Sequence, residues 1–213
     1  LEDKEIDLVV EAASQEAVSE YAIGILESGK DLMVLSIGAF SDEGLFREVS
    51  ETARDVGQRV YLPSGAILGL DGLKAVKIAG IDEVSLTTRK PPETLAATKF
   101  VKEKKIELSN LKEPKVIFEG SAREAVEAFP KSVNVAATLS LVTSGFDQTK
   151  VKVVADPSTD RNIHEIRVKG EAGEFTTRAC NVSSPDNPKT SYLAALSAIQ
   201  ELRDLTGAVT IGT

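Results

Sequence analysis

The chain has 213 residues, 27% of them charged, and a formal net charge of −8, which is the composition of a globular protein with one large domain or two small ones. The negative balance argues against nucleic-acid binding, because a basic surface is the usual footprint of that function. The longest apolar runs, such as 32–35, are too short to cross a bilayer, so we expect no membrane span. A single cysteine, Cys180, excludes an internal disulfide and a cysteine-rich metal site. We therefore expect a cytoplasmic protein without a metal.

The first 80 residues alternate between apolar strands and amphipathic helices. Continuous apolar runs predict buried strands over 6–12, 31–37 and 59–62. Helical spacing of apolar residues predicts helices over 15–26, between Ser41 and Gly57, and over 69–79. We expect Ser14 and Ser41 to cap two of these helices and Gly29 and Gly57 to end them. Short loops between such elements predict parallel strands joined by right-handed crossovers, an α/β fold.

Three loops of small residues follow these strands, at the carboxyl ends where a parallel sheet binds ligands. Small residues are common in tight turns, but three such loops together favour a groove in which a planar cofactor approaches the backbone. The candidate cofactor contacts in these loops are Ala12, Ala13, Ser14, Gly38, Ser64, Gly65 and Ala66. The sequence contains no G-x-G-x-x-G motif, so in a dinucleotide fold the phosphate-binding turn would precede Leu1. Because the chain does not begin with methionine, we expect its true start to be lost or unseen.

From residue 83 onward the pattern changes to that of a second, β-rich domain. Alternating residues predict a strand over 84–90, followed by a charged, irregular stretch to residue 114. A strand over 115–119, a helix over 122–128 and a small-residue helix capped by Asn134 come next. Further strands are predicted over 150–155, 163–169 and 174–181, and the last two would form a hairpin.

His164 is the only histidine in the chain, and an unperturbed imidazole titrates near pH 6.5. A period of two places it on one apolar strand face with Ile166 and Val168, just after the polar turn 156–160. The pattern is equally typical of an ordinary histidine with one hydrogen bond. If His164 is functional, the apolar face should lower its pKa and favour the neutral base. We interpret Cys180 as structural.

The last predicted helix carries an apolar stripe between residues 192 and 202, and a polar segment precedes it. Capping by Asn187 explains the Asn-Pro pair, but it does not explain the residues that follow. Lys189, Thr190 and Ser191 would lie in the first turn beside free N–H groups, where an anion such as a substrate carboxylate binds well. We therefore predict substrate contacts from these four residues.

Five segments taken together resemble the NAD(P)-dependent L-aspartate dehydrogenases of archaea and some bacteria: 10–14, 63–71, 134–139, 162–165 and 187–197. The resemblance implies a partial Rossmann-type parallel sheet in residues 1–82 with 189–213. It also implies a catalytic and dimerisation domain in residues 83–188, with a mostly antiparallel or mixed sheet. His164 matches the catalytic histidine of the family, and Ala66 and Asn134 match its cofactor contacts.

The function that the resemblance implies is the oxidation of L-aspartate by NAD or NADP to iminosuccinate, which then yields oxaloacetate and ammonia or feeds NAD biosynthesis. A homodimer is implied as well. Two alternatives stay open: a non-catalytic, truncated dimeric remnant without dinucleotide binding, and a related amino-acid dehydrogenase or reductase of the same architecture. The sequence does not decide between NAD and NADP.

Overall fold

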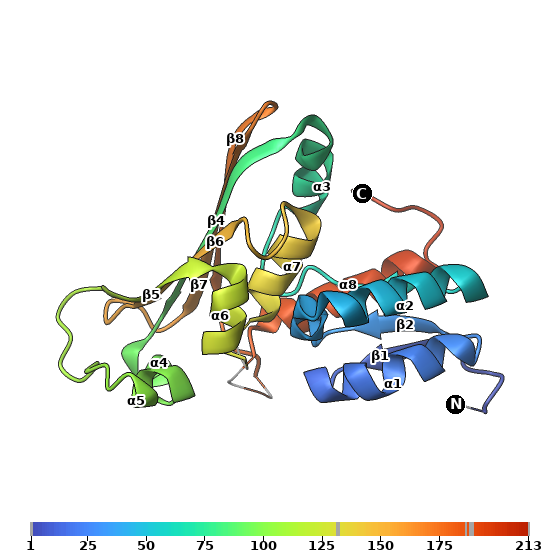
Figure 1. The fold of residues 1–213 in the computed structure, drawn as a ribbon, viewed down its shortest axis with the longest axis horizontal. Coiled ribbons are helices and arrows are strands. Elements are labelled where there is room, and N and C mark those ends of the chain that lie inside the picture. The colour runs from blue at the N-terminus through green and yellow to red at the C-terminus, as the bar shows by residue number, and fades with distance from the viewer. Residues whose placement is uncertain (1, 131–132, 186, 188–189, 213) are drawn as a thin grey trace. The chain divides into compact units, whose positions relative to one another are not determined.

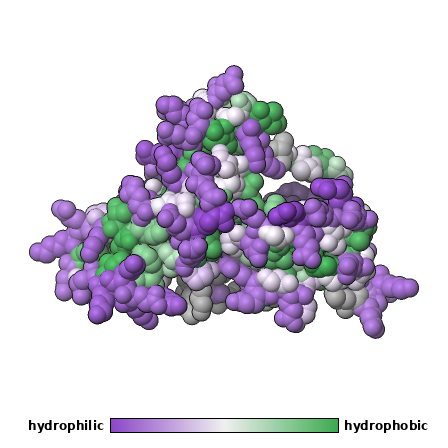
Figure 2. Space-filling model, in the orientation of Figure 1, coloured by the Kyte–Doolittle hydropathy of each residue, from purple (hydrophilic) through white to green (hydrophobic). Residues whose placement is uncertain are grey.

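The computed structural model describes residues 2–130, 133–185, 187 and 190–212. The chain divides into two compact units, residues 1–63 and 64–213, each with its own sheet (Figure 1). The larger assignment of residues 1–82 with 189–213 to one domain stays a prediction. Hydrophilic side chains, purple in Figure 2, cover much of the surface shown. In the described part of the chain, no helix combines the length and apolar character that a membrane crossing requires.

The first unit confirms the predicted parallel strands. Its strands β1 (Leu8–Glu11), β2 (Asp31–Val34) and β3 (Val60–Tyr61) form a parallel sheet in that order. Helix α1 (Gln15–Glu27) connects the first two strands, while the 3-10 turn η1 (Ile37–Ser41) and helix α2 (Glu43–Val56) connect the next two. The strands are shorter than the apolar runs that predicted them, because the runs continue into turns.

Most of the predicted helix ends of this unit are confirmed. The Ser14 hydroxyl accepts a hydrogen bond from the Ala17 N–H at 3.2 Å, and Gly29 and Gly57 adopt φ values of +78° and +74°, the left-handed region suited to glycine. The prediction that Ser41 caps the second helix is wrong. Asp42 is the cap, because one carboxylate oxygen accepts from two backbone N–H groups of the first turn, Gly44 and Leu45.

Glu11 joins the loops that follow β1 and β2. Its carboxylate is 9% exposed, and Oε1 accepts from the Ala13 N–H at 2.7 Å and the Ser14 N–H at 2.9 Å. The Ser36 N–H donates to Oε2 and the Ser36 hydroxyl to Oε1, each at 3.0 Å. Four hydrogen bonds to one buried charge satisfy its oxygens and hold the carboxyl ends of two neighbouring strands together.

The second unit contains a mixed five-stranded sheet in the order β5-β6-β4-β7-β8. Its strands are β4 (Ile81–Lys90), β5 (Lys115–Ser121), β6 (Thr149–Ala155), β7 (Asn162–Gly170) and β8 (Gly173–Asn181). The central strand β4 pairs parallel with β6 and antiparallel with β7. The predicted β7–β8 hairpin is confirmed, as is the mixed sheet.

One face of this sheet forms the core of the second unit. Register places Leu86 of β4 beside Val151 of β6 and Ile166 of β7, and all three side chains are buried. Helices α3 (Leu70–Ala79), α6 (Ala122–Ala128) and α7 (Asn134–Val142) pack in this unit, α3 against β7 and the other two against β6. The alternation predicted for 84–90 therefore marks a strand with one buried face.

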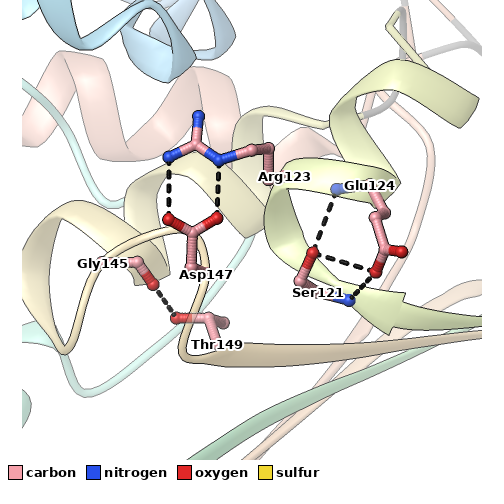
Figure 3. A network of polar contacts seen from close by, with 6 residues as sticks. All are labelled: Ser121, Arg123, Glu124, Gly145, Asp147 and Thr149. Carbon is pink, nitrogen blue, oxygen red and sulfur yellow. Dashed lines mark hydrogen bonds and ion pairs between the residues drawn. The ribbon is translucent and has the colours of Figure 1, made fainter.

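A network of polar contacts fixes α6 to the turn before β6 (Figure 3). Ser121 and Glu124 form a reciprocal capping box at the start of the helix. The Arg123 guanidinium donates twice to the Asp147 carboxylate, at 2.6 Å from Nε and 3.1 Å from Nη2, and the Thr149 hydroxyl donates to the Gly145 carbonyl at 2.8 Å. The two hydrogen bonds of the Arg123–Asp147 pair align α6 with the turn that leads into β6.

Three predictions for the second unit are wrong. The stretch predicted to be irregular contains two short helices, α4 (Pro92–Ala96) and α5 (Lys99–Glu103), which bury Leu95 and Val101. Asn134 is the first residue of α7 and not its cap. Helix α8 (Tyr192–Thr206) begins after the segment predicted to be its first turn. The backbone of Thr190 and Tyr192 bonds residues 182–184 instead: the Tyr192 N–H donates to the Val182 carbonyl, and the Ser184 N–H donates to the Thr190 carbonyl.

Replacing Glu11 with Gln should lower the stability of the first unit. The amide has one accepting oxygen and no charge, so the loops after β1 and β2 lose charge-assisted hydrogen bonds worth about 1–3 kcal/mol in total. Urea unfolding followed by circular dichroism should show a lower midpoint for Glu11→Gln. The control is Glu27→Gln, because Glu27 is exposed at the end of α1. Equal midpoints for the two variants would contradict the role of Glu11.

Candidate active site

The candidate site lies at one edge of the five-stranded sheet. Strands β4 and β6 are parallel, so their carboxyl ends reach the same edge, and the antiparallel strand β7 begins there. This arrangement brings together the end of β4 at Lys90, the turn that starts at Asp156, and His164 near the start of β7. The edge thus collects two cationic or basic groups and one carboxylate from three separate segments.

His164 is placed as the sequence predicts, on the buried face of β7 with Ile166 and Val168. The imidazole is 6% exposed. Its cross-strand partner in β4 is Thr88, and Nδ1 lies 3.0 Å from the Thr88 hydroxyl oxygen. Since Thr88 is buried as well, this hydrogen bond is shielded from water and holds the ring in one orientation.

The Thr88 hydroxyl determines which imidazole nitrogen is available for chemistry. A threonine hydroxyl can donate or accept. If Nδ1–H donates to the Thr88 oxygen, the lone pair on Nε2 is free to accept a proton, as a general base requires. If Nδ1 accepts instead, Nε2 carries the hydrogen and cannot act as a base. Sequence reasoning missed Thr88, although its place on the alternating strand 84–90 was available as a signal.

Burial lowers the pKa of His164 to about 3, first through the loss of hydration and then through the positive charge of Lys90. The direction agrees with the expectation from its apolar strand face. The imidazole is therefore neutral at physiological pH, and a neutral imidazole is the form that accepts a proton.

Lys90 is the second group that sequence reasoning missed. It follows Thr88 by two positions on β4, so both side chains point to the same face of the sheet. Burial lowers the pKa of its ammonium group. Lys90 and Thr88 both line a cavity of about 30 Å³, which α6 and α7 close with Ala125 and Ala136. The sequence did carry a signal: in the alternating strand 84–90, Lys90 falls on the same face as the apolar residues that are buried.

Asp156 fixes the ends of the two parallel strands. Its carboxylate is buried and accepts from the Ser158 hydroxyl at 2.6 Å and the Ser158 N–H at 2.9 Å. Arg89 Nη1 lies 3.5 Å from the other oxygen, Oδ2, and the Asp156 N–H donates to the Lys90 carbonyl. The Ser158 hydroxyl, more than Arg89, holds the pKa of this carboxyl below its usual value. Asp156 thus acts as an anchor for the end of β4.

The Ser64–Ala66 loop is held by side chains of the second unit. Gly65 has a φ of +65°, in the left-handed region that favours glycine, and its N–H donates to the Ser197 hydroxyl of α8 at 3.0 Å. The Ala66 carbonyl accepts from the side-chain amide of Asn181 at 3.0 Å, and Asn181 is buried at the end of β8. Asn181 is a further residue that the sequence did not indicate.

The other predicted cofactor contacts are distributed over both units. Ala12, Ala13 and Ser14 follow β1, where Glu11 binds the N–H groups of the latter two. Gly38 is buried within η1, and Asn134 is exposed at the start of α7. Their roles in cofactor binding stay predictions.

The predicted anion site before α8 does not have the geometry expected of it. Thr190 and Ser191 lie before the first turn of the helix, and the Thr190 N–H donates to the carbonyl of the exposed Asn187. Ser191 is buried. Lys189 lies outside the described residues. A substrate contact from any of the four stays a prediction.

Two further observations concern the described part of the chain. Within the described ranges, no group of three or more His, Cys, Asp or Glu side chains could hold a metal ion. An open cleft of about 790 Å³ lies between α4, residues 108–111 and the turn 157–160. None of the predicted site residues lines this cleft.

The pH dependence of stability should reveal the buried neutral state of His164. Its pKa is about 3 when folded and about 6.5 when unfolded, so the unfolded chain binds more protons between these values. The free energy of unfolding contributed by His164 is complete above pH 6.5 and should fall with decreasing pH, by on the order of 1 kcal/mol per pH unit. Urea unfolding at pH 7, 6, 5 and 4.5 should therefore show the stability gap between wild type and His164→Asn changing in favour of the variant. Parallel curves would contradict a buried neutral histidine.

Comparisons with known proteins agree over both units. A family model described as the C-terminal part of aspartate dehydrogenase matches residues 71–205. A second model, described as the NAD-binding domain of homoserine dehydrogenase, matches residues 1–63. The first match spans more than half of the chain, and the second covers the unit that contains the parallel sheet.

Relatives and solved structures point the same way. An L-aspartate dehydrogenase of Methanococcoides burtonii is 50% identical over 99% of this chain and 78% of its own length. The corresponding protein of Methanosarcina acetivorans is 51% identical over 98% and 77%. A crystal structure of aspartate dehydrogenase from Thermotoga maritima has a TM-score of 0.84 at 35% identity, covering 99% of this chain and 80% of its own. With a family model and close relatives in agreement, the chain belongs to the aspartate dehydrogenase family.

Proposed function

We propose that this NAD(P)-dependent dehydrogenase oxidises L-aspartate to iminosuccinate and that His164 is its general base. The observation that carries the proposal is a buried imidazole held by Thr88 at the edge of the five-stranded sheet where β4 and β6 end, and burial lowers its pKa. The name L-aspartate dehydrogenase, carried by relatives about 50% identical over nearly the whole chain, supports the choice of substrate.

The residues present fit part of a nicotinamide dinucleotide. The carboxyl ends of β1 and β2 meet in loops of small residues that the Glu11 carboxylate joins, and such loops admit a flat ring close to the backbone. Ala12, Gly38, the Ser64–Ala66 loop and Asn134 are the contacts we propose. We propose that these residues contact the nicotinamide ring and ribose of the dinucleotide. When bound, the nicotinamide supplies the hydride acceptor.

The proton chemistry follows from the hydrogen bond to Thr88. We take Nδ1–H to donate to the Thr88 oxygen, which leaves Nε2 to accept a proton from the substrate ammonium group. Loss of that proton frees the nitrogen lone pair that forms the imine as the Cα–H bond breaks. The apolar surroundings exclude water from the imidazole and keep it neutral until substrate binds.

The imidazolium that results from proton transfer is disfavoured in the empty site, both by burial and by the charge of Lys90. A substrate with two carboxylates brings negative charge next to both groups, and an adjacent anion raises the basicity of an imidazole. The site is therefore better suited to an anionic amino acid than to a neutral one. A panel of amino-acid substrates would separate aspartate from the substrates of related dehydrogenases.

The setting of the reaction is also part of the proposal. We propose a cytoplasmic homodimer that joins through the sheet of the second unit, with iminosuccinate consumed in NAD biosynthesis or hydrolysed to oxaloacetate and ammonia.

Replacing His164 with Ala should lower kcat about 10²–10⁴-fold, the usual contribution of a general base. The rate is measured from the absorbance of NADH or NADPH at saturating L-aspartate. Cys180→Ser serves as the control, because this exposed side chain has no proposed role and its loss should leave the rate unchanged. A rate within twofold of wild type in His164→Ala would remove the histidine from the mechanism.

Replacing Thr88 with Val should remove the preference for the Nδ1–H tautomer while keeping the shape of the side chain. Because the chain has one histidine, a spectrum of the protein labelled with ¹⁵N-histidine reports His164 alone. We expect the Nδ1–H form in the wild type, a shift toward Nε2–H in Thr88→Val, and a fall in kcat of roughly tenfold, the worth of one hydrogen bond. Thr88→Ser, which keeps the hydroxyl, should retain both the tautomer and the rate. Nε2–H in the wild type would refute this assignment of the base.

A further inference from the structure

Lys90 is the last residue of β4, and its ammonium group has no hydrogen-bond or ion-pair partner among residues 2–130, 133–185, 187 and 190–212. The carboxylate of Asp156, whose N–H donates to the Lys90 carbonyl, is already bound by Ser158 and Arg89. Removing an ammonium from water without a counter-charge is unfavourable, and the lowered pKa of Lys90 reflects that cost. An ammonium group without a counter-charge in the protein is suited to bind an anionic ligand.

The space beside Lys90 fits one small polar group. The cavity that it lines with Thr88 measures about 30 Å³, more than the roughly 10–15 Å³ that a single water needs and far less than a whole amino acid needs. Apart from these two residues its walls are apolar: Leu86, Leu95, Ala125, Phe129, Val133, Val135, Ala136, Val151 and Val153. An apolar wall strengthens the attraction between a cation and an anion inside it. One carboxylate group has the required size and charge.

The cavity is next to the base. Thr88 lies directly opposite His164, so Lys90, two residues further along the same strand face, is a diagonal neighbour of the imidazole. Diagonal neighbours in a sheet are about 7–8 Å apart at their Cα atoms, within reach of a long side chain. The positive charge of Lys90 contributes to the lowered pKa of His164, which agrees with a short distance between the two side chains.

We propose that Lys90 binds the side-chain carboxylate of the substrate and orients the α-ammonium group toward His164, so that it selects dicarboxylic over neutral amino acids. The inference rests on the proposed function for the identity of the reaction, but the anion site itself depends only on Lys90 and the cavity. In this proposal Lys90, and not the segment before α8, is the main contact for the side-chain carboxylate of the substrate.

The first test compares Lys90→Met with wild type in steady-state kinetics with L-aspartate and L-asparagine. Methionine keeps the length of the side chain and removes its charge. A lost charge-assisted hydrogen bond corresponds to roughly a 10- to 150-fold change, so KM for L-aspartate should rise by that factor, while kcat/KM for L-asparagine changes less than threefold. Lys150→Met is the matched control, because Lys150 is an exposed lysine on the neighbouring strand β6. An unchanged KM for L-aspartate, or an equal loss with both substrates, would overturn the proposal.

A second test does not depend on turnover. Succinate carries two carboxylates but no amino group, so it probes the anion site without reacting. Titrated into the protein labelled with ¹⁵N-histidine, succinate should shift the ring-nitrogen resonances of the one histidine in wild type and in Lys150→Met, and should have no effect in Lys90→Met. Acetamide, which is neutral, should leave the histidine resonances of all three proteins unchanged. A response that persists in Lys90→Met would exclude Lys90 as the anion partner.

The two tests separate the inference from the proposed function. Succinate binding that needs Lys90, in a protein inactive on L-aspartate, would support the anion site and refute the substrate. If Lys90→Met oxidises L-aspartate with the wild-type KM, the substrate is supported and the anion site at Lys90 is refuted. Thermal unfolding checks that each variant folds, and Lys90→Gln, which keeps a polar amide, replaces Lys90→Met in both tests if the methionine variant does not fold.

Discussion

The pairing of β4 with one parallel and one antiparallel neighbour is the constraint on which the candidate site depends. The parallel partner β6 ends at the same edge as β4, and the antiparallel partner β7 begins there. An all-antiparallel sheet would place the ends of β4 and β6 at opposite edges and separate Lys90 from Asp156. The register of the β4–β7 pair then fixes the chemistry, since it sets Thr88 opposite His164; a slip by one residue would turn the imidazole to the other face.

Loss of hydration gives this edge its electrostatic character. The same apolar surroundings lower the pKa of His164 and of Lys90, which leaves a neutral base beside a cation without a counter-charge. The carboxylate of Asp156 does not relieve this imbalance, because Ser158 and Arg89 engage it. The arrangement is complete only when an anion binds, and this physical argument links the folded structure to an acidic substrate.

Local sequence signals predicted the elements well and failed where distant segments pair. Ser14 and Gly57 act within one helical turn of their own positions, so their roles as helix ends could be read from the sequence. The start of α8 could not be read from the sequence, because residues 190–192 pair with residues 182–184 instead of forming a helical turn. The Ser41 prediction failed for a smaller reason: the adjacent Asp42 caps the helix with two hydrogen bonds.

The sequence by itself determined that the chain alternates strands and helices, that His164 lies on a buried strand face, and that five segments together resemble one family of dehydrogenases. Only the tertiary structure decided which groups meet that histidine. Thr88 lies 76 positions away from it in the chain, and Lys90 is marked in the sequence by nothing except its phase in an alternating strand. A strand's own pattern shows which face is buried, whereas its partners are fixed by register and sheet order, which depend on the packing of the whole unit.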